Sequence, residues 1–168
     1  APATVSVVGN GLGGGLSASL AISSGTLVLN VGAAPSVSTV AGSATNTTTA
    51  TVNGNVTSDG GSSVTDRGTV YKVTSPVTIS DGKTQSGTGT GAFSVNLSSL
   101  AVSTRYYFRA YAINTFGTTL GSELQIWTLA NTPSAPTVAA VSTTSLSVDV
   151  NPNSNPSSTE YAIQETTS

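Results

Sequence analysis

Apolar and small polar residues alternate along much of this chain with a period of two, and this pattern constrains the fold more than any other feature. The alternation runs through residues 16–22, 27–31, 93–97 and 145–150. A period of two places every second side chain on one face of an extended strand, whereas a helix needs a period of about 3.6. Charged residues, which favour exposed helix surfaces, are only 7% of the chain. The sequence therefore predicts an all-β fold.

The composition excludes several classes of chemistry. The 168-residue chain has no Cys and no His, while 27 Ser and 28 Thr make up about a third of it. Zinc fingers, thiolate metal sites, cysteine nucleophiles and the Ser-His-Asp triad are therefore excluded. The net charge is −2, which offers no electrostatic surface for nucleic acid or an anionic membrane. A hydrophobic content of 37% with so little net charge indicates a folded chain.

Turn signals divide the chain into three predicted units. Residues 1–33 contain a short predicted strand at 5–8 and a β-hairpin around Ser24-Gly25. This unit has neither a charge nor an aromatic ring, and its short strands cannot bury a core alone. We interpret it as the closing strands of a preceding, incomplete β domain.

Residues 34–131 hold seven predicted strands, the number found in an immunoglobulin-like sandwich. One of them is placed at 77–79, before the turn Ser80-Asp81-Gly82, and the glycine-rich stretch 87–91 is expected to be a flexible connector. The third unit, 132–168, contains predicted strands at 137–141, 145–150 and 160–164. These three strands are less than half of a second sandwich, so this unit is also incomplete.

The alternation also predicts the core of the middle unit. On strand 105–114 one face carries Tyr106, Phe108, Ala110 and Ala112, and the other carries Arg105, Tyr107, Arg109, Tyr111 and Ile113. The first face is expected to pack with Val70, Phe93, Val95, Leu97, Leu124 and Ile126. Trp127 points away from this core on the same pattern, so we expect it at an interdomain or rim contact.

Residues 100–117, LAVSTRYYFRAYAINTFG, resemble the end of a fibronectin type III domain. The matched positions are Leu100, Thr104, Tyr106, Arg109, Ala112, Asn114 and Gly117. Val102 and Ser103 stand where the family has Pro and Gly. The resemblance implies that Tyr106 forms the tyrosine corner, in which the hydroxyl bonds to upstream backbone. It covers about residues 34–168 and looks like a variant repeated in tandem in large secreted and surface-anchored bacterial proteins.

The candidate catalytic and ligand-binding motifs lack the structural context that their chemistry requires. Residues 9–14 match GxGxxG, but a period-two segment follows where a nucleotide-binding fold needs a helix. The seven carboxylates are scattered over loops and strand ends, without the fixed pair of a glycosidase or calcium-binding spacing. Arg67 or Arg109 can pair with Asp66 or Glu123 across strands. We predict that the chain is not an enzyme and has no catalytic, cofactor or metal residues.

Two hypotheses for the function remain. The first is a non-catalytic structural or adhesive segment of a secreted or cell-surface bacterial protein, acting as spacer, stalk or filament material. The alternative is an accessory carbohydrate- or protein-binding module of a secreted multidomain enzyme, with Trp127, Tyr107, Tyr111 or Phe116 stacking on the ligand. The expected partners are neighbouring β domains of the same chain, other copies by strand complementation, or a surface glycan or protein. Nucleic acid and membrane insertion are not expected.

Overall fold

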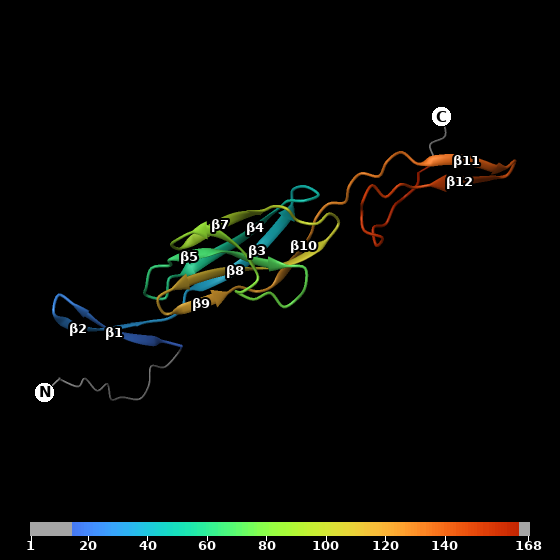
Figure 1. Ribbon diagram of the computed structural model, residues 1–168. Coiled ribbons are helices and arrows are strands. Elements are labelled where there is room, and N and C mark those ends of the chain that lie inside the picture. Colours follow the sequence, from blue (N-terminus) through green and yellow to red (C-terminus); the bar gives the residue numbers. More distant parts are fainter. Residues whose placement is uncertain (1–14, 165–168) are drawn as a thin grey trace.

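The computed structural model describes residues 15–164, and this part of the chain consists of β-strands and irregular segments without a helix. The strands are β1 (Ser17–Ser23), β2 (Thr26–Gly32), β3 (Ser36–Ala44), β4 (Ala50–Ser58), β5 (Asp66–Lys72), β6 (Gly82–Gly87), β7 (Gly91–Leu97), β8 (Arg105–Asn114), β9 (Gly117–Leu120), β10 (Leu124–Trp127), β11 (Thr137–Ser142) and β12 (Ser145–Asp149). Figure 1 shows a central sandwich between two hairpins. The chain enters this sandwich at one end and leaves it at the opposite end. Within the described residues, no helix is long and apolar enough to cross a membrane.

The central unit is built from two antiparallel sheets. One sheet has the strand order β3-β4-β7, and the other has the order β10-β8-β5-β6, with β9 also paired to β8. A three-stranded sheet facing a five-stranded one, in which β9 and β10 both pair with β8, forms an immunoglobulin-like, fibronectin type III-like sandwich. The predicted fold class is confirmed: one complete sandwich is flanked by two-stranded β units.

The inner faces of the two sheets form the main core. From β8 the core takes Tyr106, Phe108, Ala110 and Ala112, and from β7 it takes Phe93, Val95 and Leu97, all buried as predicted. Ile126 is buried here and Leu124 partly so. Phe108 is fully buried, and burying a side chain of this kind contributes about 2–3 kcal/mol. This cluster is the larger of the two buried clusters of the sandwich.

Val70 was assigned to the wrong side of its sheet. In the strand register Tyr71 pairs with Phe108, so Tyr71 faces the main core, and Val70 pairs with Arg109 on the outer face. There Val70 forms a second buried cluster with Val77 and Tyr111. Both faces of β5 are thus buried, and the alternation within β5 alone does not show which face belongs to the main core.

The segment after β5 corrects a second prediction. Residues 77–79 are not a strand; they belong to the β5–β6 loop, whose Val77 is fully buried in the second cluster on the outer face of the sheet. The strand of this region is β6 instead, and its sequence GKTQSG contains no apolar side chain. A strand at the sheet edge needs only backbone pairing to one neighbour, so it leaves no hydrophobic signature.

The N-terminal hairpin β1–β2 follows the prediction. Its turn is Ser24-Gly25, with φ angles of 49° and 78°, a pair of left-handed residues that suits a two-residue hairpin turn. The apolar side chains of this hairpin are exposed, and Ile22 reaches 79%. The strand predicted at 5–8 and the glycine-rich motif at 9–14 lie outside the described residues. At the other end β11 pairs with β12, but residues 160–164 form no strand, contrary to expectation.

Candidate functional site

The carboxylates of the sandwich serve its structure. Asp66 accepts hydrogen bonds from Lys83 and Tyr111, and Asp81 pairs with Lys72 at 3.0 Å. Glu123 accepts from Ser75 Oγ at 2.5 Å and from the Val77 N–H at 2.6 Å. Within residues 15–164 no group of three Asp, Glu, His or Cys side chains is placed to hold a metal ion. These carboxylates therefore stabilise loops and strands through hydrogen bonds and ion pairs.

The arginines predicted to pair with carboxylates bind backbone carbonyls instead. Arg67 Nη1 donates to Thr90 O at 2.8 Å and to Gly91 O at 3.1 Å, which fixes the glycine-rich connector onto the sandwich. Arg109 Nε donates to Gly121 O at 2.7 Å. The Gly121 carbonyl belongs to the irregular segment between β9 and β10, where three residues face two on β8. A β-bulge changes the direction in which nearby groups point. The sequence pattern did not reveal this bulge.

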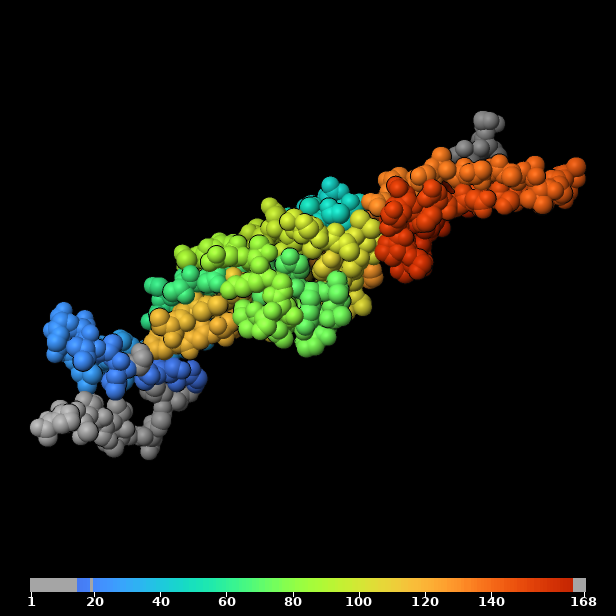
Figure 2. Space-filling model, in the orientation of Figure 1, coloured from blue at the N-terminus to red at the C-terminus, as the bar shows by residue number. Residues whose placement is uncertain are grey.

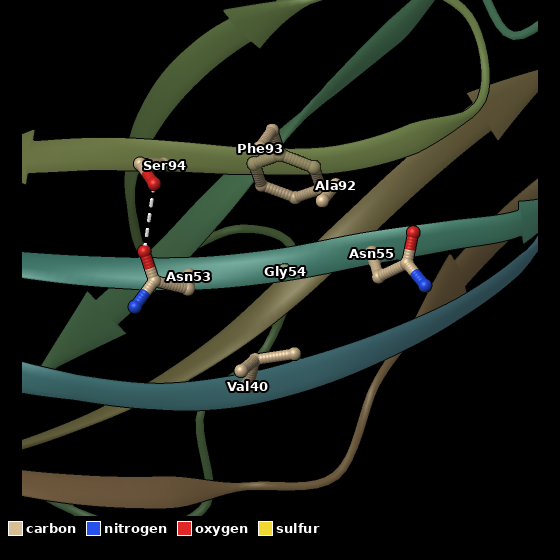
Figure 3. Close-up of a pocket in the computed structure, with 7 residues that line it drawn as sticks. All are labelled: Val40, Asn53, Gly54, Asn55, Ala92, Phe93 and Ser94. Atoms are coloured by element: carbon tan, nitrogen blue, oxygen red, sulfur yellow. Dashed lines mark hydrogen bonds between the residues drawn. The ribbon is translucent and has the colours of Figure 1, made fainter.

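A shallow hollow lies on the outer face of the three-stranded sheet (Figure 3). It has a volume of about 550 Å³ and is lined by Val40, Asn53, Gly54, Asn55, Ala92, Phe93 and Ser94. Ser94 Oγ donates to Asn53 Oδ1 at 2.8 Å, and Asn53 Nδ2 donates to Ala41 O at 2.7 Å. The lining has no ionisable side chain, and its polar groups partly satisfy one another. The hollow therefore offers no side chain that can act as acid or base, and the hydroxyl of Ser94 is hydrogen-bonded to the Asn53 amide with no base beside it.

The structure separates the aromatic residues that the sequence singled out. Tyr106 accepts a hydrogen bond at its hydroxyl from the Ala101 N–H, 2.9 Å away and five residues upstream, which is the contact expected of a tyrosine corner. Tyr111 is fully buried, so its proposal as a surface contact is wrong. Burial, helped by the hydrogen bond to Asp66, raises the pKa of the Tyr111 phenol. Tyr111 points to the outer face of β8, as the alternation predicts, but the β5–β6 loop covers its side chain.

The remaining aromatic candidates lie at two different places. Phe116 sits in the β8–β9 turn against Gly32, close enough that a Cβ on Gly32 would lie 2.3 Å from its ring. Trp127 and Tyr107 share the outer face of β8 and β10, and Trp127 is 56% exposed. Arg105, which the sequence did not single out, lies beside both of these rings. Its position follows from the pairing of Trp127 with Arg105 in the strand register.

The linker that enters the sandwich is held by several contacts. The Ala33 N–H donates to Gly60 O at 2.8 Å, and Asn114 Nδ2 donates to Ala33 O at 2.8 Å. Pro35 is fully buried. Gly60 has a φ of 70°, and a Cβ there would lie 2.1 Å from Ala33 O, so only glycine allows the β4–β5 loop this close to the linker. The first junction is therefore packed and hydrogen-bonded.

Asn114 is the centre of this first junction. Its side-chain amide donates to the carbonyls of Ala33 and Asp59, while its Oδ1 accepts from the N–H groups of Phe116 and Gly117. One buried side chain thus joins the linker, the β4–β5 loop and the β8–β9 turn. The resemblance to the fibronectin type III pattern included Asn114, but only the fold shows that it contacts the preceding linker.

The linker that leaves the sandwich is held in a comparable way. The Leu129 N–H donates to Asn46 O and its carbonyl accepts from the Ser103 N–H. Beyond it, the Asn131 N–H donates to Asn155 Oδ1 at 2.7 Å, and Asn155 Nδ2 donates back to Asn131 O at 2.8 Å. Asn155 is buried. This reciprocal pair fastens the second linker to the loop that follows β12, a contact that sequence reasoning missed.

The Glu123 carboxylate makes the stability of the sandwich depend on pH. The hydrogen bond from Ser75, then the one from Val77 and the nearby charge of Arg109, hold the pKa of Glu123 below its ordinary value of 4.5. A lowered folded-state pKa means that ionised Glu123 stabilises the fold above about pH 4.5. This contribution is lost as the pH falls through the folded-state pKa.

We expect Glu123→Gln to lower stability at pH 7 and to lower it less at pH 3, because protonation of the wild-type carboxyl as the pH falls through its folded-state pKa removes the advantage of the ionised group. Urea unfolding midpoints at the two pH values measure the effect. Glu160→Gln, a substitution of an exposed carboxylate in the C-terminal unit, is the matched control and should leave both midpoints unchanged. Equal losses at both pH values for Glu123→Gln would contradict the assignment.

No protein-family profile and no curated protein matches the sequence. Among solved structures, the chain is similar to the sensor domain of the anti-sigma factor RsgI4 in Pseudobacteroides cellulosolvens, at 20% identity and a TM-score of 0.44, over 58% of this chain and 96% of that one. It is similar to the sixth domain of human fibronectin type III domain containing protein 3 at 21% identity and a TM-score of 0.41, over 61% and 88%. Titin domains match at 20% identity and a TM-score of 0.33, over 60% and 35%.

Proposed function

We propose that this chain is a non-catalytic spacer segment of a secreted or cell-surface protein, in which β units are joined end to end by anchored linkers. One observation carries the proposal: the linkers on the two sides of the sandwich are both hydrogen-bonded to it, at opposite ends (Figures 1 and 2). Linkers held in this way restrict rotation between units, whereas free Gly- and Ser-rich linkers do not. A series of such units holds whatever it carries at a set distance.

The surface chemistry supports the same role. Charged residues are few and the net charge is −2, while hydroxyl and amide side chains cover the outer face of the three-stranded sheet. The outer face of the three-stranded sheet is therefore hydrated without attracting charged polymers strongly. The resemblance of residues 34–168 to tandem repeats of large bacterial surface proteins is consistent with such a spacer.

The rigidity of the junctions tests this proposal. Because the chain has no Cys, spin labels can be placed only at introduced cysteines. We would combine Ser98→Cys in the sandwich with either Thr26→Cys in the N-terminal hairpin or Thr143→Cys in the C-terminal hairpin. Pulsed electron paramagnetic resonance then gives the distance distribution across each junction. We expect one narrow distribution for each pair.

A pair within the sandwich, Ser98→Cys with Thr118→Cys, provides the reference width. Distributions across the junctions that approach this width support the spacer role. Distributions several times broader would show freely jointed units and would contradict it.

A further inference from the structure

The outer face of β8 and β10 carries a cation between two aromatic rings. The guanidinium carbon of Arg105 lies 5.1 Å from the ring centre of Tyr107 and 5.6 Å from that of Trp127. The exposed amide of Gln125 stands opposite Tyr107 in the strand register. We call Arg105, Tyr107, Gln125 and Trp127 the tryptophan–arginine surface. The spacer role assigns it no purpose.

Arg105 differs from the other cations of the chain. Lys72 and Lys83 form ion pairs with aspartates, and Arg67 and Arg109 donate to backbone carbonyls. The Arg105 side chain forms no hydrogen bond or ion pair with any residue between 15 and 164. Its charge is exposed and has no anionic partner in this part of the molecule. An anion is the ligand that this charge complements.

The two rings prepare Arg105 for such a ligand. The cation–π contacts with both rings restrict the guanidinium, so that less side-chain entropy is lost when its N–H groups bind a carboxylate. Trp127 is more than half exposed, so its indole remains open to a second ligand group. The surface therefore combines a guanidinium group that can bind a carboxylate with an exposed indole ring on which a second ligand group can pack.

We propose that the tryptophan–arginine surface binds an acidic polysaccharide whose sugar rings carry carboxylates. The C–H face of one sugar ring lies on the Trp127 indole, and the ring carboxylate accepts hydrogen bonds from Arg105. A neighbouring hollow of about 350 Å³, lined by Tyr107, Glu123, Leu124 and Gln125, receives the next sugar. The Gln125 amide is placed to bind its hydroxyls. Glu123 keeps its negative charge, which the nearby cations Arg109 and Lys72 offset in part, so the carboxylate of this next sugar points away from it.

The position of the surface favours a polysaccharide over an acidic peptide. A peptide gains much of its affinity by adding a strand to a free sheet edge. The tryptophan–arginine surface consists of side chains that project from the sheet face of β8 and β10, and it does not include the free edge of β10. Such a set of side chains suits a ligand that binds through ring stacking and hydroxyl groups.

Trp127 is the only tryptophan of the chain, so its fluorescence reports directly on this surface. The probe is polygalacturonate, titrated into the full 168-residue chain at low salt. We expect a saturable change in Trp127 emission and protection from quenching by acrylamide. Fully methyl-esterified polygalacturonate lacks the charge and should bind about tenfold more weakly.

Three substitutions sharpen the test. Arg105→Gln should weaken binding about tenfold, and Arg105→Lys should recover only part of the affinity because it lacks the planar fork. Trp127→Ala, measured by calorimetry, should also lose about tenfold. Lys83→Gln and Leu146→Ala remove a cation and an exposed apolar side chain elsewhere and should leave the affinity unchanged. Urea unfolding checks that each variant folds.

Several outcomes would overturn the proposal. One is the absence of any fluorescence change up to millimolar sugar concentration. Another is binding that survives both Arg105→Gln and Trp127→Ala. Equal affinity for polyglutamate would show that charge alone is recognised and would remove the assignment to a polysaccharide. None of these results bears on the junction distances, so the spacer role is tested independently.

Discussion

Asn114→Ala is expected to lower the free energy of unfolding of the sandwich by about 3 kcal/mol. Asn114 is buried and its side chain bonds five backbone groups, three carbonyls and two N–H groups, with the bond to Ser62 O the longest at 3.5 Å. Alanine leaves these groups without their partner, and each unsatisfied buried group costs about 1–3 kcal/mol where water cannot replace the bond. Some water entry at the junction keeps the total below the sum. Urea unfolding with an unchanged m-value measures the loss.

The same substitution should also loosen the first junction. Asn114 Nδ2 is one of the groups that hold Ala33, so the distance distribution between labels at positions 26 and 98 should broaden. The distribution across the second junction should not change. Asn96→Ala is the matched control, because Asn96 is exposed and, among residues 15–164, its side chain bonds only Thr51. A loss below about 1 kcal/mol for Asn114→Ala, similar to a surface substitution, would contradict the central role of Asn114.

Gly54→Ala should destabilise the sandwich by about 2–3 kcal/mol, although it adds a single methyl group. A Cβ on Gly54 would lie 2.4 Å from Cζ of Phe93 and 2.8 Å from Cβ of Ala110. Neither neighbour can move away freely, because both belong to the main core between the two sheets. Overpacking of a filled core costs about 1–3 kcal/mol. The unfolding midpoint in urea is the measurement.

A double substitution separates overpacking from a loss of strand propensity. Phe93→Leu removes the ring that the new methyl group meets, so Gly54→Ala should cost clearly less in the Phe93→Leu background than in the wild type. Ser98→Ala, at an exposed position, is the control, and it gives the change in the free energy of unfolding expected of a neutral substitution. If the cost of Gly54→Ala were the same in both backgrounds, the contact with Phe93 would not be its cause.

The prediction from sequence succeeded where one face of a strand is buried and the other is exposed. On β7, Phe93, Val95 and Leu97 are buried and the residues between them are exposed, so the alternation alone identifies the core face. On β5, Thr69 and Val70 are both buried, and the pattern contains no information on which of two covered faces is the main core. This explains why Val70 was misplaced while Phe93 was not.

The burial of Tyr111 shows a different reason for failure. Its strand position puts it on the outer face of β8, as the alternation predicts. It is buried because the β5–β6 loop folds over that face, where Val77 packs in the same cluster. Loop paths depend on contacts made far away in the sequence, such as those of Glu123 with Ser75 and Val77. No local pattern at Tyr111 records them.

The sequence by itself determined the all-β class, the hairpin at Ser24-Gly25 and the inner faces of β7 and β8. These features follow from the period of two and from turn residues, which act over a few neighbouring positions. Only the tertiary structure decided that Asn114 holds the linker and that Arg105 stands between Tyr107 and Trp127. Those contacts depend on strand register and loop paths, because they join residues that are distant in the sequence and leave no periodic signal in it.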